Sequence, residues 1–131
     1  MHAAIIVTGG VTSNTVGTSV ELLHSDGSPW CSLPNLPEYG RYAHTQTGLE
    51  ACGGYGPGEG TTTTCVRLEA GSWTPSHQLV ERRANHCSWA SPAGTLLIGG
   101  GYDDHGMNTT ELPDANTGDS VTSFPLKYDT R

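Results

Sequence analysis

The sequence predicts an all-β fold on three observations. Glycine makes up 18 of the 131 residues, about twice its usual share. No segment keeps a 3.6-residue apolar period over about 12 residues, as an amphipathic helix would. Short apolar runs instead end in Gly, Pro, Asn or Asp every 8–12 residues or so, which is typical of strands joined by turns. With 34% hydrophobic residues and three tryptophans, the chain can build a core, which argues against disorder.

Length and charge exclude several classes of protein. A chain of 131 residues predicts a single domain, residues 1–131. No apolar run approaches the roughly 20 residues that a membrane-spanning helix needs. The net charge is −7, and the only adjacent cations are Arg82 and Arg83. Nucleic acids and anionic membranes attract clustered cations, so neither is an expected partner.

The sequence repeats itself with a period of 42 to 46 residues. Strands that end in paired glycines occur three times, and the tryptophan marker and the Arg-x-x-His motif occur twice each. The markers are Gly9 and Gly10, Gly53 and Gly54, Gly99 and Gly100, Trp30 and Trp73, Arg41 and His44, and Arg83 and His86. Because the markers keep one order, they predict a repeat architecture.

Each cycle is predicted to contain four strands. A strand ending in the glycine pair is followed by a loop and a second strand, such as residues 19–23. A tight turn, at 24–27 or 69–71, leads to the tryptophan strand. A bend marked by Pro and Leu, at 33–37 in the first cycle, leads to the Arg-x-x-His strand. Turns between short strands at this spacing are typical of antiparallel sheets.

A four-stranded sheet with two apolar faces needs partners on both sides. Sheets stacked radially, as the blades of a β-propeller, bury these faces against one another. Glycines allow backbones to approach where the strands crowd near the axis, and a tryptophan supplies a large apolar body between blades. We therefore expect Trp30 and Trp73 to be buried.

In their order and spacing, the glycine pair, the tryptophan and the Arg-x-x-His motif resemble kelch repeats over nearly the whole chain. The resemblance implies β-propeller blades with the Arg-x-x-His strand innermost and the tryptophan strand outermost. It implies a partial blade at 1–37 without its inner strand, a complete blade at 38–80, and a third at 81–131. The third blade departs from the pattern because Phe124 stands where tryptophan is expected.

A closed propeller has about 4 to 8 blades, and this chain supplies fewer than three complete ones. We expect a homo-oligomer, with a homodimer of half-rings closing a six-bladed ring. The other interpretation is that the chain is a piece of a longer propeller.

The four cysteines suggest one disulfide. Cys52 ends a glycine-pair strand and Cys65 begins the next strand, so the two can face each other at disulfide distance. Cys31 and Cys87 fall in different blades, and their state stays open. Asn108 begins an Asn-x-Thr glycosylation sequon. Together these features favour a secreted or extracellular protein, the alternative being four reduced cysteines in the cytosol.

Few residues point to chemistry. His44 and His86 hold equivalent positions, so we interpret them as packing residues rather than as metal ligands or acid–base groups. No C-x-x-C or Gly-x-Ser-x-Gly motif occurs, and no catalytic residue, metal or cofactor is predicted. One polar loop and one aromatic residue are candidates for binding a partner: Tyr55, Tyr102, Asp103, Asp104 and His105.

Three function classes remain open. The kelch resemblance implies a protein-interaction module without catalytic activity, which binds an unknown protein partner through its loops. A glycan-binding propeller is the second, because Trp30, Trp73, Trp89 and Tyr55 could stack on sugars if they are exposed. The third is a fragment of a galactose-oxidase-like propeller, whose copper radical chemistry needs Tyr, Cys and His ligands. We favour the interaction module, an inference from fold alone.

Overall fold

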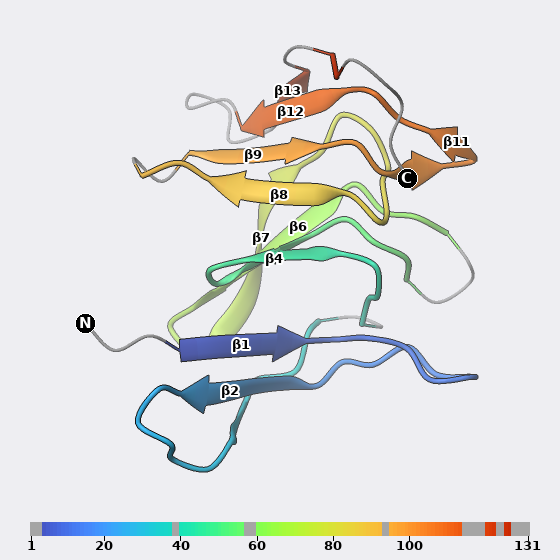
Figure 1. The fold of residues 1–131 in the computed structure, drawn as a ribbon. Helices are drawn as coiled ribbons and strands as arrows, with labels where there is room; N and C mark the ends of the chain where they lie inside the picture. Colours follow the sequence, from blue (N-terminus) through green and yellow to red (C-terminus); the bar gives the residue numbers. More distant parts are fainter. Residues whose placement is uncertain are drawn as a thin grey trace.

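The computed structural model describes residues 4–37, 40–56, 60–92, 95–113, 120–122 and 125–126. These residues form strands, turns and loops and contain no helix, so the predicted all-β class is confirmed. The strands make three antiparallel sheets and one small hairpin (Figure 1). Phe124 lies outside the described residues.

The sheets follow one another in chain order. The first sheet pairs its strands in the order β1 (Ala4–Thr8), β2 (Val20–His24) and β3 (Cys31–Leu33). The second has the order β4 (Thr45–Thr47), β5 (Glu50–Cys52), β6 (Thr64–Glu69) and β7 (Ser72–Gln78). The third has the order β8 (Cys87–Ala90), β9 (Leu96–Gly99), β12 (Thr110–Pro113) and β13 (Ser120–Thr122). A hairpin of β10 (Tyr102–Asp103) and β11 (His105–Gly106) joins β9 to β12.

Three strands of each sheet follow the same order, and the second and third sheets each add one edge strand, β4 or β8. The sheets lie in a stack, with the second sheet in the middle (Figure 1). Their registers are equivalent, since the last residue of β1, β5 and β9 faces Val20, Cys65 and Thr110 respectively. The strand after each Arg-x-x-His motif, β4 or β8, lies at one edge of its sheet. Residues at matching registers can therefore be compared directly from sheet to sheet.

Two apolar clusters hold the stack together. Between the first and second sheets, the buried side chains belong to Val20, Leu36, Ala51 and Val66. Between the second and third sheets, they belong to Cys52, Cys65, Leu79, Leu96 and Ile98. Alternate residues of a strand point to opposite faces, so the middle sheet contributes to both clusters.

The paired glycines allow neighbouring sheets to meet closely. Gly9 and Gly53 have φ values of 61° and 64°, a region that favours glycine. A Cβ atom on Gly9 would lie 2.2 Å from the carbonyl oxygen of Arg41, and one on Gly53 would lie 2.6 Å from that of Arg83. The second glycine of each pair donates a backbone hydrogen bond to the same carbonyl, at 2.9 and 2.8 Å. Any other residue at the first position would push the sheets apart.

The third glycine pair differs from the prediction by one residue. Gly100 and Gly101 have φ values of 68° and 97° and follow the strand, as the earlier pairs do. Gly99 is the last residue of β9 and matches Thr8 and Cys52 in register. Three successive glycines leave the register of the motif undetermined in the sequence, and the strand pairing decides it.

The burial expected for the tryptophans is wrong for Trp30. Its side chain is 50% exposed. Trp73, at the matching position in β7, is half-buried, packs against the first apolar cluster, and donates its Nε1 hydrogen to the Pro34 carbonyl at 2.8 Å. That carbonyl belongs to the bend of the preceding sheet. Within the described residues no such bend precedes the first sheet, so Trp30 has no equivalent surface to pack on.

Candidate functional site

The arginine of the second Arg-x-x-His motif is the centre of a buried ionic network. Arg83 is fully buried and donates to Glu111 Oε2 from Nε and Nη2, at 3.1 and 2.8 Å. Its Nη1 donates to the carbonyls of Gly100 and Thr109, at 2.6 and 3.1 Å. The buried Glu111 carboxylate also accepts the backbone N–H of Val80 at 2.5 Å. Through the carbonyls of Gly100 and Thr109, Arg83 holds the segment between β9 and β12 in place. Because its charge and donors are paired inside the protein, Arg83 is not available to a ligand.

His44 and His86 join neighbouring sheets. His44 Nε2 lies 2.7 Å from the Thr8 hydroxyl, and His86 Nε2 lies 3.0 Å from the Thr45 hydroxyl. Burial, and then the arginine three residues earlier, lower the pKa of each imidazole from 6.5 to about 4. Both rings are therefore neutral at pH 7. In the part of the chain that the structure describes, neither belongs to a cluster of three metal-ligating groups.

Four of the five residues predicted to bind a partner surround one cavity, which we call the edge cavity. It has a volume of about 330 Å³ and is lined by Tyr55, Gly60, Thr61, Arg82, Tyr102, Asp103 and Asp104. Tyr55 and Tyr102 hold equivalent positions, because each directly follows the glycine pair that ends a strand, β5 in the second sheet and β9 in the third. His105 does not line the edge cavity. It follows the hairpin turn at Asp104, where φ is 60°, and this turn separates His105 from the lining residues Tyr102 and Asp103.

Aromatic and acidic groups dominate the edge cavity. The Tyr55 ring stacks on that of Tyr42, with centroids 5.1 Å apart and planes 24° apart. Burial, and then the neighbouring tyrosines and aspartates, raise the pKa of Tyr55. Asp103 Oδ1 accepts the Thr61 hydroxyl at 2.5 Å. The one cationic lining group, Arg82, donates to the Thr61 carbonyl at 3.2 Å. Such a surface suits a cationic group, through carboxylates and the faces of the rings.

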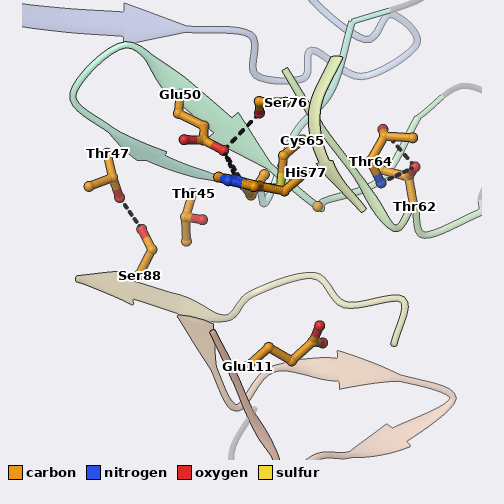
Figure 2. Close-up of a disulfide and its surroundings, with 12 residues drawn as sticks. Thr45, Thr47, Glu50, Thr62, Thr64, Cys65, Ser76, His77, Ser88 and Glu111 are labelled. Carbon is orange, nitrogen blue, oxygen red and sulfur yellow. Dashed lines mark hydrogen bonds and ion pairs between the residues drawn. A yellow bond between two sulfur atoms is a disulfide. The ribbon is translucent and has the colours of Figure 1, made fainter. Parts of the chain in front are cut away.

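The predicted disulfide between Cys52 and Cys65 is confirmed, and it lies beside a polar cluster that the sequence analysis missed. Glu50 Oε1 accepts the Ser76 hydroxyl at 2.8 Å and contacts His77 Nδ1 (Figure 2). The same oxygen lies 3.8 Å from Cys52 Sγ. Three metal-ligating atoms, from Glu50, Cys65 and His77, lie within 4.8 Å of one another.

The local strand geometry explains this cluster. Glu50 and Cys52 are two residues apart on β5 and point to the same face, and Cys65 is the partner of Cys52 on β6. The register between β6 and β7 shifts between Thr64 and Val66, which marks a bulge in β7 at Ser76 and His77, opposite Cys65. A bulge re-aims a side chain, so alternation in the sequence could indicate Glu50 but not His77.

The outer face of the third sheet carries a second cavity of about 330 Å³. Its lining is largely apolar and includes Cys87, Trp89, Leu97, Gly99 and Leu126. Cys87 is a free, exposed thiol, as Cys31 is on β3. The side chain of Trp89 is 58% exposed. On the opposite end of the stack, Ile5 and Val7 of β1 are exposed.

Comparison with models of known protein families and with curated proteins finds no match for this chain. Among the described residues, no helix is long and apolar enough to cross a membrane. The side chain of Asn108, which begins the predicted sequon, is exposed. Function is therefore inferred from the geometry of the molecule.

Proposed function

We propose that the chain is a non-catalytic protein-interaction module made of kelch-like propeller blades, and that two copies assemble into a closed ring. The repeated contacts between sheets support this proposal. In the first two glycine pairs, the second glycine binds the carbonyl of the next Arg-x-x-His arginine, and each motif histidine binds a threonine of the preceding sheet. A stack with a constant step between sheets suits radial closure.

The exposed outer face of the third sheet is the observation that carries this proposal. In the second sheet, Thr45 and Thr47 contact the following sheet, through His86 at 3.0 Å and Ser88 at 2.5 Å. Cys87 and Trp89 hold the matching positions in the third sheet, since Cys87 pairs with the last residue of β9 as Thr45 pairs with that of β5. Within the described residues both are exposed. An apolar groove at positions built to meet another sheet indicates a docking face.

The outer face of the first sheet exposes apolar side chains that can pack on the outer face of a third sheet. Val7 matches Ala51 and Ile98 in register, and these two are buried against the preceding sheet. Val7 itself is 47% exposed. The first sheet of one copy can therefore pack on the third sheet of another, as sheets pack within the chain. Two such contacts related by a twofold axis close a ring.

The mass in solution tests this assembly. Light scattering on a size-exclusion column is expected to give twice the 13.8 kDa of the chain. Trp89→Glu and Val7→Lys place a charge on one docking face each, and either variant is expected to give a monomer because a buried unpaired charge is costly. Ser25→Glu, in an exposed turn, is the matched control and should stay dimeric. A monomeric wild-type protein, or a dimer that neither variant disrupts, contradicts the proposal.

We propose the edge cavity as the surface that binds a basic segment of a partner protein. The carboxylates of Asp103 and Asp104 and the rings of Tyr55 and Tyr102 meet there, and a net charge of −7 attracts cations at long range. An alternative glycan platform is less well supported, since the exposed Trp30 directly precedes β3 of the first sheet and the exposed Trp89 lies on β8 of the third, and neither lines the edge cavity. The disulfide and the exposed Asn108 support an extracellular location.

A labelled peptide with two arginines between glycines tests the edge cavity. We expect fluorescence anisotropy to show binding that weakens as salt is added, because exposed charges are screened. Asp104→Asn is expected to weaken binding several-fold, whereas Asp26→Asn, in a distant exposed turn, should leave it unchanged. A peptide with glutamates in place of the arginines should not bind. Equal binding of both peptides would contradict the proposed chemistry.

A further inference from the structure

The cluster beside the disulfide departs from the repeat. Glu50, Cys52 and Cys65 match Ile6, Thr8 and Val20 in the first sheet, and Leu97, Gly99 and Thr110 in the third. Packing therefore requires no carboxylate or thiol at these positions. The motif histidines, by contrast, recur in both motifs and have a packing role. Only the second sheet places a carboxylate and thiols in this buried layer. Polar groups that the repeated packing does not need indicate a function other than packing.

We propose that the Cys52–Cys65 disulfide is the oxidised form of a zinc site whose four ligands are Cys52, Cys65, His77 and Glu50. Two thiolates, one imidazole and one carboxylate are ligands that suit Zn²⁺. The atoms of Glu50, Cys65 and His77 already lie within 4.8 Å of one another. A tetrahedral site has bonds of about 2.0–2.3 Å. Forming it requires these ligand atoms to move slightly closer together and the disulfide between the two sulfur atoms to be reduced.

The surroundings indicate a structural site with all four positions filled by protein. Glu50, Cys52 and Cys65 are buried, and His77 is partly buried. Leu96 and Ile98 of the third sheet, together with Leu79, which directly follows β7, pack in one buried cluster with the two cysteines. A closed, four-coordinate site of this kind holds strands together and leaves no position for a substrate. The ligands come from β5, β6 and β7, so the metal would join three of the four strands of the second sheet.

The disulfide and the metal exclude each other, which makes the site sensitive to redox conditions. A dithiol delivers two electrons and two protons to the disulfide and is itself oxidised to a disulfide, leaving two protein thiols. Zn²⁺ then displaces the two thiol protons and binds the thiolates. In an oxidising environment the disulfide joins β5 to β6. In a reducing environment the metal would join β5, β6 and β7 through its ligands.

Metal titration of the full chain tests the site. The protein is reduced with a phosphine, which forms the phosphine oxide with an oxygen atom from water and leaves no competing thiol. We expect one Zn²⁺ per reduced chain by calorimetry, and none for the oxidised chain. Co²⁺ used in place of Zn²⁺ should give thiolate charge-transfer absorption and the visible bands of tetrahedral cobalt.

Matched variants show which residues bind the metal. His77→Ala and Cys65→Ser are expected to weaken zinc binding by more than the 10- to 100-fold or so that loss of an outer-shell partner costs. His24→Ala and Cys31→Ser change an exposed histidine and an exposed free cysteine, and should leave zinc binding unchanged. If the reduced chain unfolds, zinc should restore its circular dichroism, since metal binding and folding are coupled. The proposal is overturned if the reduced chain takes up no zinc, if zinc fails to refold it, or if only the control variants lose binding.

Discussion

Replacement of Arg83 by methionine is expected to destabilise the protein by about 3–5 kcal/mol. Arg83 and Glu111 are both fully buried, and the guanidinium donates two hydrogen bonds to one carboxylate oxygen. Methionine fills a similar volume but leaves the Glu111 charge in the interior without its partner. It also removes the donors to the carbonyls of Gly100 and Thr109. Denaturant unfolding followed by tryptophan fluorescence measures the loss.

Two further variants separate the buried charge from other effects. Arg67→Met breaks an ion pair with Glu69 whose side chains are more than half exposed, so a change within about 0.5 kcal/mol is expected. Arg83→Met combined with Glu111→Gln removes both charges and should recover part of the stability lost in the single variant. If Arg83→Met unfolds at the same denaturant concentration as the wild-type protein, the ionic network of Arg83 and Glu111 does not stabilise the fold.

Acid is expected to unfold the protein through its two motif histidines. Burial lowers the pKa of His44 and His86 to about 4 in the folded state, against about 6.5 in the unfolded chain. The unfolded chain therefore binds protons first as pH falls, and stability is lost between pH 6.5 and pH 4 and is regained on return to pH 7. With about 1.4 kcal/mol for each tenfold change in proton affinity, the loss is on the order of 2–3 kcal/mol for each histidine.

The pH dependence of the unfolding free energy of His86→Gln provides the check. Glutamine keeps a polar group near the Thr45 hydroxyl but does not titrate, so the slope between pH 6.5 and pH 4 should decrease. His24→Gln, on an exposed position of β2, should keep the wild-type slope. An unchanged slope in His86→Gln would show that the ring is not held neutral by burial.

Several features of this protein are determined by sequence alone because they depend on neighbours along the chain. Turn residues between short apolar runs specify the strands, and the spacing of Gly9 and Gly53 locates the ends of β1 and β5. The disulfide also follows from local order, since Cys52 and Cys65 lie on strands joined by one loop. Likewise, His44 and His86 hold the same position in the two Arg-x-x-His motifs, which predicts equivalent contacts. Each binds a threonine of the preceding sheet.

Only the tertiary structure decided what depends on register and on contacts between sheets. The pairing of β9 with β12 shows that Gly100, and not Gly99, begins the third glycine pair. The exposure of Trp30 depends on what lies beyond the first sheet. A bulge in β6–β7 turns His77 toward Glu50, which lies 27 residues earlier. Alternation along a strand specifies which face a residue takes, but the partner on that face is set by strand pairing and sheet packing between distant segments.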